Sequence, residues 1–211
     1  MDNTLYSSST KIFDMIDYNM KDFISKKLDI SIDKAFKIQK KFYKEYGTTL
    51  FGLMKYHDID PDEFLNYVHN IDFSKLKKSE KLNYYLQRLP GKKIVFTNGD
   101  KNYAKKVLNS LGILERIDKI YDIKKGNYIP KPKLETYKNL INNFNINPLK
   151  TVFFEDIEKN LKPAYDLGMT TVHIDVETKD IETKKLKKFI DFKFKCIKSA
   201  LKMILKIVKV N

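Results

Sequence analysis

Six polar side chains in this sequence are of the types that hold a phosphate group beside a metal ion. They are three carboxylates, a hydroxyl, an amide and an ammonium group: Asp2, Thr97, Asn98, Lys131, Glu155 and Asp156. Carboxylates are ligands for a hard cation such as Mg²⁺, while hydroxyl, ammonium and backbone N–H groups bind phosphate oxygens. Together these residue types favour magnesium-assisted phosphoryl transfer.

Four of these residues directly follow short apolar runs that are typical of buried strands. Thr97 and Asn98 end the run 93–96, and Glu155 and Asp156 end the run at 151–154. Alone, a Thr in this place also fits a turn, and an acidic pair also fits a helix N-terminus that its macrodipole stabilises. Their recurrence at strand ends, with Asp2 and Lys131, favours a shared site.

The second half of the chain alternates strand-like and helix-like segments. Strands are expected at 93–96, 120–123, 151–154 and 170–174, and helices at 103–111, at 134–144 and in the segment ending at Gly168. This order predicts an α/β fold with a parallel sheet covered on both faces. Ligands of such sheets bind beyond the carboxyl ends of the strands, where the six polar residues are expected.

The first half has a different sequence pattern, in which apolar residues recur at helical spacing from about residue 9 to 88. Ser31 is a candidate N-cap, Gly47 a helix end, and Asp60-Pro61 a helix start. We expect a helical domain at 9–88, an α/β core made of 1–8 and 89–178, and a basic tail at 179–211.

Composition narrows the class of protein. The chain has 211 residues, 42% apolar content and a net charge of +14. Residues 179–211 hold eleven Lys against three acidic residues, a net of +8 that leaves +6 for the rest. The remaining Lys is mixed with acidic and neutral residues, without the Arg clusters or aromatic signature of an RNA-binding module, so no nucleic-acid partner is expected. The single cysteine, Cys196, favours a reducing cytoplasm.

The tail carries one apolar helical face, formed by Ile197, Leu201, Ile204, Leu205 and Val208, with lysines off that face. An interfacial amphipathic helix that contacts a membrane has this pattern. A surface helix packed on the domain, a self-association element and out-of-frame sequence fit as well, so these alternatives stay open, as does the oligomeric state.

The motifs resemble those of the haloacid dehalogenase superfamily. Its first motif, a strand followed by Asp-x-Asp-x-Thr-Leu, matches Asp2-Asn3-Thr4-Leu5 from its second Asp onward. The other three match residues 94–99, the loop Ile129-Pro130-Lys131-Pro132, and Phe153-Phe154-Glu155-Asp156. Longer stretches at 46–54, 67–72, 89–91 and 160–172 resemble its pyrimidine 5'-nucleotidase branch. The resemblance implies that the helical block is a cap inserted in the core.

The resemblance also implies a role for each matching residue. Asp2 corresponds to the general acid and base whose backbone carbonyl contacts Mg²⁺. Thr97, with the N–H groups near Asn98 and Gly99, corresponds to the phosphate-binding motif, and Lys131 to the lysine that offsets charge on phosphate and nucleophile; Lys133 is its rival. Asp156 corresponds to a direct Mg²⁺ ligand and Glu155 to a residue acting through a metal-bound water.

The substrates implied are nucleoside 5'-monophosphates, most specifically UMP and CMP. Candidates for reading the base, from the resemblance alone, are Tyr6, Thr48, Thr49 and His69. The family's nucleophile, an Asp that forms an aspartyl-phosphate, would lie two positions before Asp2, on a central strand between the strands that end at Thr97 and Glu155. We expect a start upstream of Met1; a catalytically inactive remnant that only binds phosphate is the alternative.

Overall fold

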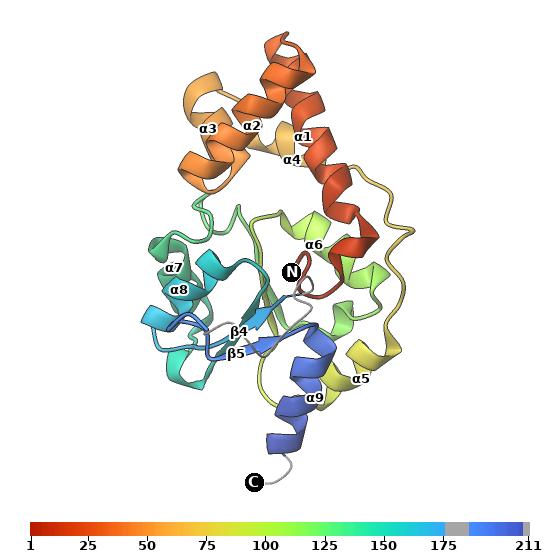
Figure 1. Cartoon of the computed structure of the whole chain (residues 1–211), viewed down its shortest axis with the longest axis vertical. Helices are drawn as coiled ribbons and strands as arrows, with labels where there is room; N and C mark the ends of the chain where they lie inside the picture. The colour runs from red at the N-terminus through yellow and green to blue at the C-terminus, as the bar shows by residue number, and fades with distance from the viewer. Residues whose placement is uncertain (176–185, 209–211) are drawn as a thin grey trace.

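The computed structural model describes residues 1–175 and 186–208, and it divides into a helical part and an α/β part (Figure 1). The chain begins in the α/β part, with the short helix η1 (Ser8–Thr10) leading out of it. The helical part consists of α1 (Ile12–Leu28), α2 (Ile32–Tyr46), α3 (Thr49–His57) and α4 (Pro61–Val68). These helices stand together at the top of Figure 1, above the strands.

The residues predicted to begin or end helices do so in the structure. The Ser31 hydroxyl accepts a hydrogen bond from the backbone N–H of Lys34 at the start of α2, and Gly47 ends that helix with a φ of 87°. Asp60 caps α4 and Pro61 occupies its first turn. A capping side chain satisfies a backbone N–H group that lacks a partner within the helix, so these residues fix where the helices begin.

The strands form two parallel sheets. β1 (Ile94–Phe96) pairs with β2 (Lys119–Tyr121), while β4 (Thr170–Ile174) lies between β3 (Val152–Glu155) and β5 (Phe192–Phe194). Among the described residues, no strand pairs with both β1 and β3. The central strand that the resemblance places between them is therefore not found in the described part of the chain. The expected α/β fold with its four strands is confirmed; β5 was not predicted.

Two hydrophobic clusters cover opposite faces of the strands. The side chains of β1 alternate, so that Phe96 joins a cluster with Tyr137 of α7 (Leu134–Phe144), whereas Val95 joins the large cluster on the other face. The first cluster also includes Ala164 of α8 (Glu158–Asp166). The large one includes residues of α6 (Lys101–Ser110) and continues into the helical part. Period-two alternation therefore buries both faces of the strands.

The α/β part also holds two helices that the expected boundaries placed elsewhere. α5 (Glu80–Arg88), inside the range 9–88, packs against α9 (Ile197–Val208) and the short helix η2 (Leu114–Arg116). Figure 1 shows α5 and α9 side by side at the end of the molecule opposite α1–α4. A further short helix, η3 (Pro148–Lys150), precedes β3.

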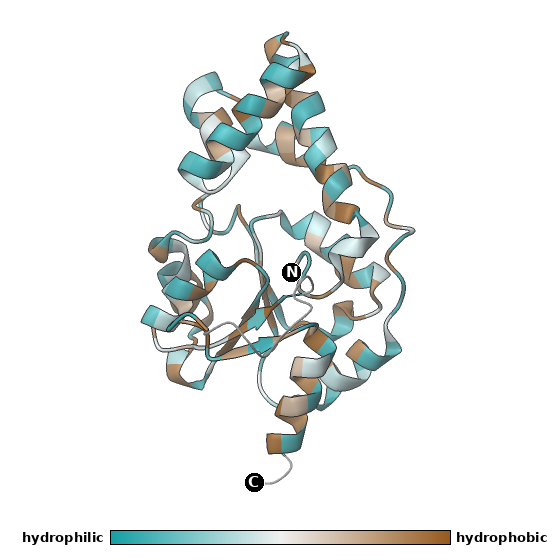
Figure 2. Cartoon of the chain, in the orientation of Figure 1, coloured by the Kyte–Doolittle hydropathy of each residue, from teal (hydrophilic) through white to brown (hydrophobic). Residues whose placement is uncertain are grey.

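The helix in the basic tail is packed on the core. Ile197, Leu201 and Leu205 are at most 8% exposed, and Figure 2 shows α9 alternating between apolar and polar stretches. Three residues of the apolar face are thus buried, which supports the interpretation of a surface helix packed on the domain. Of the helices in the described ranges, none combines the length and apolarity that a bilayer-spanning segment needs.

Candidate functional site

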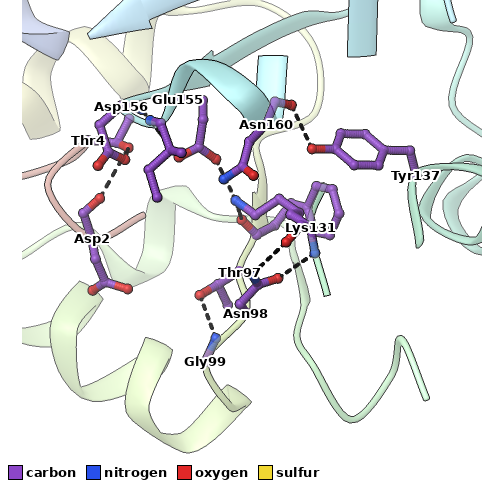
Figure 3. A network of polar contacts seen from close by, with 12 residues as sticks. Asp2, Thr4, Thr97, Asn98, Gly99, Lys131, Tyr137, Glu155, Asp156 and Asn160 are labelled. Atoms are coloured by element: carbon purple, nitrogen blue, oxygen red, sulfur yellow. Dashed lines mark hydrogen bonds and ion pairs between the residues drawn. The ribbon is translucent and has the colours of Figure 1, made fainter. Parts of the chain in front are cut away.

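A buried ion pair lies where the two sheets approach each other. Lys131 Nζ is 2.5 Å from Glu155 Oε2 and donates to the carbonyl oxygen of Phe96 at 3.2 Å. Both partners of the pair are at most 5% exposed. Burial acts to raise the pKa of Glu155, but the charges of Lys131 and the N-terminal ammonium group, together with hydrogen bonds from Asp156 and Lys131, outweigh it and hold that pKa at about 2. The pair therefore stays charged, and Lys131 joins the ends of β1 and β3 (Figure 3).

Asn98 holds the Lys131 loop in place. Its Oδ1 accepts from the backbone N–H of Lys131 at 2.8 Å, and its Nδ2 donates to the Lys131 carbonyl oxygen at 3.3 Å. The Asn98 side chain thus positions Lys131, as Figure 3 shows, and its backbone N–H group stays the group expected to bind phosphate. Lys133, the rival for this role, is exposed and occupies the N-cap position of α7 without a side-chain hydrogen bond. The structure brings Lys131 rather than Lys133 into the site.

Thr97 and Gly99 form a tight turn at the end of β1. The Thr97 hydroxyl accepts a hydrogen bond from the Gly99 N–H at 3.0 Å, and Thr97 is buried. A Cβ atom at Gly99 would lie only 3.0 Å from Cδ1 of Tyr103, so a larger residue at this position would press on the ring of Tyr103. The Thr97 hydroxyl keeps its own proton for a ligand, because it acts as acceptor in the turn.

The hydroxyl of Thr4 joins Asp156 to the backbone of Asp2. It donates to Asp156 Oδ1 at 2.8 Å and lies 3.2 Å from the Asp2 carbonyl oxygen. Burial and the charge of neighbouring Glu155 raise the pKa of Asp156 to about 7. Nε2 of His173, on β4, lies 2.9 Å from the carbonyl oxygen of Asp156 and fixes the loop after β3. Two oxygens that suit a hard cation, the Asp2 carbonyl and the Asp156 carboxylate, are thus held close together.

The carboxylate of Asp2 points away from this pair of oxygens (Figure 3). Its Oδ1 accepts from the hydroxyl groups of Tyr6 and Tyr103, each at 2.7 Å. Burial, together with the Asp2 charge, raises the pKa of both tyrosines, so both remain hydrogen-bond donors. Both hydrogen bonds use Oδ1, which leaves Oδ2 for a reacting group.

The expected metal ligands do not all converge. In the described part of the chain, no three His, Cys, Asp or Glu side chains gather into a metal-ligand set. Glu155 is occupied by Lys131 and by the N–H groups of Asp156 and Ile157, and only the carbonyl of Asp2 lies near Asp156. The residues present offer two oxygen ligands. Mg²⁺ commonly binds through one or two carboxylates, with water and phosphate completing its shell, so this partial set fits it.

The cap residues that are candidates for reading the base make contacts outside the cluster of Thr97, Lys131 and Asp156. Thr48 caps α3 by accepting from the N–H of Phe51, and the Thr49 hydroxyl donates to the carbonyl oxygen of Gln39. His69 is buried and lies 2.5 Å from Asp100. Gly47 sits over the Lys131 loop, since a Cβ on it would lie 3.3 Å from the Lys131 carbonyl oxygen. The cap therefore reaches the site through Gly47.

Sequence reasoning missed the residues that support the site. Thr4 belongs to the quoted first motif, and its hydroxyl could have been assigned from that position. Tyr103 and Asp100 carried no signal, because a Tyr inside a helix and an Asp at its N-cap are ordinary residues there. The contact of Tyr103 depends on the approach of α6 to Asp2, and that of Asp100 on its approach to His69, which local spacing does not reveal.

Comparisons with known proteins identify the family of the chain. The model of the haloacid dehalogenase-like hydrolase family matches residues 1–168, and the chain belongs to that family. Phosphate metabolism protein 8 of Saccharomyces cerevisiae is 31% identical over 187 residues, covering 80% of this chain and 58% of that protein. Validoxylamine A 7'-phosphate phosphatase of Streptomyces hygroscopicus is 30% identical over 87 residues, covering 37% of this chain and 39% of that one. The chain thus spans less than two thirds of either curated relative.

Solved structures share the fold. A phosphatase of the superfamily from Thermococcus onnurineus aligns with a TM-score of 0.62 at 21% identity, over 99% of this chain and 94% of that one. A hydrolase of the superfamily from Bacillus subtilis, whose structure is described as bound to magnesium, aligns with a TM-score of 0.53 at 13% identity, over 92% of each chain. These similarities confirm the α/β fold of the chain.

Proposed function

We propose that this chain is a Mg²⁺-dependent phosphomonoesterase that hydrolyses nucleoside 5'-monophosphates, with UMP and CMP as substrates. The observation that carries the proposal is the convergence of Thr97, Lys131 and Asp156, from three separate loops, at the carboxyl ends of β1 and β3. Family membership and the names of the relatives support phosphate-ester chemistry. The cytoplasmic setting and the absence of a nucleic-acid partner remain predictions.

In this proposal the phosphoryl group lies between Thr97 and Lys131. The Thr97 hydroxyl and the backbone N–H of Asn98 donate to phosphoryl oxygens, and the Lys131 charge stabilises the charge that develops on them. Mg²⁺, held by Asp156 and the Asp2 carbonyl, would supply further charge neutralisation. Glu155 sets the position of Lys131 through their ion pair, and the resemblance also implies that it acts through a metal-bound water.

Asp2 carries the proton transfers. Asp2 enters this step with a proton on Oδ2, donates it to the oxygen of the departing nucleoside, and as the resulting carboxylate later accepts one from the attacking water. Tyr6 and Tyr103 fix the carboxylate by holding Oδ1. The resemblance puts the nucleophilic Asp two positions before Asp2, in a strand that would lie between β1 and β3.

One observation favours a second substrate class. The relative named for validoxylamine A 7'-phosphate acts, by that name, on a phosphate ester that is no nucleotide. A different small phosphate ester is therefore the alternative substrate, because cap residues rather than the fold set specificity. A chain that binds phosphate without catalysis is the other alternative.

A phosphate-release panel separates these proposals. The chain is preceded by an apolar strand ending in Asp-x, and it is assayed with Mg²⁺ on UMP, CMP, a sugar phosphate and phosphoglycolate. Release from UMP and CMP is expected, and it should disappear when the added Asp is replaced by Asn. Release only from the other esters would support the second class. A folded protein that binds phosphate but releases none from any of the esters would support the non-catalytic alternative.

A further inference from the structure

A buried histidine on β4 holds the backbone of the loop that carries Asp156. His173 is 4% exposed, and the pairing of β4 with β3 places it beside Glu155, the residue before Asp156. Its Nε2 lies 2.9 Å from the carbonyl oxygen of Asp156. Because a carbonyl oxygen only accepts hydrogen bonds, Nε2 is the donor in the neutral and the charged ring alike. A neighbouring strand thus holds the Asp156 carbonyl in place.

The other nitrogen of the His173 ring is left without a hydrogen bond. Nδ1 is buried and has no hydrogen-bond partner among the described residues. A buried polar atom without a partner costs free energy, and an apolar side chain of similar size would pack here without that cost. Packing alone therefore gives little reason for a histidine at this position. Its hydrogen bond to Asp156 is what an apolar side chain could not replace.

Asp156 is held at three points. Its N–H donates to Glu155 Oε1 at 3.2 Å, and its carboxylate accepts from the Thr4 hydroxyl at 2.8 Å. These two bonds come from residues that Figure 3 shows within the site. His173 adds the third bond, to the Asp156 carbonyl, from a different strand. With the backbone held on both sides of its Cα atom, the Asp156 carboxylate has few directions left besides that of the Asp2 carbonyl oxygen.

We propose that His173 is a positioning residue for the metal site, because its bond to the Asp156 backbone aims that carboxylate at the place where Mg²⁺ would bind. This inference rests on the proposed function, in which Asp156 and the Asp2 carbonyl hold Mg²⁺. His173 touches neither metal nor substrate and acts through Asp156. Loss of a residue that orients a metal ligand commonly weakens metal affinity by about 10- to 100-fold.

The test titrates the full chain with Mg²⁺ alone, at constant pH. The backbone amide signals of Asp156 and Ile157 are followed in ¹⁵N spectra, which can report weak binding and require no hydrolysis. His173→Leu removes the donor, so it is expected to weaken the Mg²⁺ affinity by about tenfold or more. An unchanged affinity in His173→Leu overturns the proposal.

Two amide variants distinguish positioning from packing. His173→Gln places an N–H group at about the reach of Nε2, whereas His173→Asn carries the same amide on a side chain that is one carbon shorter. The Gln variant is expected to restore most of the Mg²⁺ affinity, and the Asn variant to resemble His173→Leu. Equal affinities in the two amide variants overturn the proposal. This pair also decides the matter should His173→Leu fail to fold.

Urea denaturation of the same variants separates this role from a structural one. His173→Leu removes the bond to Asp156 and the unpaired Nδ1 together, so its urea midpoint should stay close to that of the unaltered chain. A lower midpoint with unchanged Mg²⁺ affinity would show a structural histidine and overturn the proposal. His57→Leu is the control, because His57 is exposed at the end of α3, and it should leave the Mg²⁺ affinity unchanged.

Failure of this inference and failure of the proposed function give different results. Equal Mg²⁺ affinity in the unaltered chain and in all three His173 variants overturns the positioning role but leaves magnesium-dependent hydrolysis standing. If Mg²⁺ does not shift the Asp156 signal of the unaltered chain, both the positioning role and the proposed metal site are overturned.

Discussion

The two sides of the candidate site are held by different forces. On the side of β3, Lys131 and Glu155 form a buried ion pair that uses the charges of both groups. On the side of α6, the charge of Asp2 is held by two neutral tyrosine hydroxyls that share one of its oxygens. The ion pair fixes the framework, whereas the tyrosines orient a carboxylate and leave Oδ2 free. A site that transfers protons needs the second arrangement.

The largest effect is expected from breaking the ion pair. Lys131→Met leaves the Glu155 carboxylate buried without its partner, which should lower the free energy of unfolding by about 3 to 5 kcal/mol. Urea denaturation measures this loss. Lys133→Met is the matched control, because Lys133 is exposed, and it should change stability by less than about 0.5 kcal/mol. Equal losses in the two variants would show that the pair does not hold the framework.

A smaller effect is expected on the tyrosine side. Tyr103→Phe removes one of the two hydroxyls that bond to the Asp2 carboxylate, at an expected cost of about 1.5 to 3 kcal/mol. The same substitution in the Asp2→Asn background should cost less, because the charged acceptor is gone. Urea denaturation of the four proteins of this cycle gives the coupling. A coupling of zero would mean that the hydroxyl does not hold Asp2.

The close approach of Gly99 to Tyr103 can be tested next. In Gly99→Ala the new methyl group meets the Tyr103 ring at 3.0 Å, so the ring must shift, at a cost of about 1 to 2 kcal/mol in urea denaturation. Gly91→Ala is not a matched control because its φ is 74°. Gly99→Ala in the Tyr103→Leu background should recover part of the loss. No recovery would show that the ring is not the obstacle.

The smallest effect is a pH dependence. The pKa of Asp100 is lowered in the folded chain, so its hydrogen bonds add stability that is fully present above its unfolded pKa of about 3.9 and is lost as the pH falls through the folded value. The stability difference between the chain and Asp100→Asn should therefore shrink from pH 6 to pH 3. Urea denaturation across this range measures it, and a difference that grows on acidification would contradict the arrangement.

Local signals in the sequence were enough for most of the fold. Ser31, Gly47 and Asp60 mark helix ends by capping chemistry that needs no distant partner. The four predicted strands were apolar runs followed by polar residues, which is a local pattern. β5 was missed because Phe192–Phe194 is short and lies in a Lys-rich segment, where only its pairing with β4 defines it as a strand.

The site could be predicted only in part. The identity of Thr97, Lys131 and Asp156 followed from strand ends and motif resemblance. The partners chosen by each side chain did not, because Asn98 and Glu155 satisfy their hydrogen bonds within the protein once the loops pack. Such choices depend on contacts between residues far apart in sequence, which spacing alone does not determine.

The central claim is that the Thr97 and Lys131 side of the site binds the phosphoryl group of a nucleotide with Mg²⁺. Calorimetric titration of the full chain with UMP tests it most directly, with and without Mg²⁺ and in Thr97→Val and Lys133→Met. We expect Mg²⁺-dependent binding that weakens at least tenfold in Thr97→Val and is unchanged in Lys133→Met. UMP binding that is indifferent to Mg²⁺ and to Thr97→Val would contradict it.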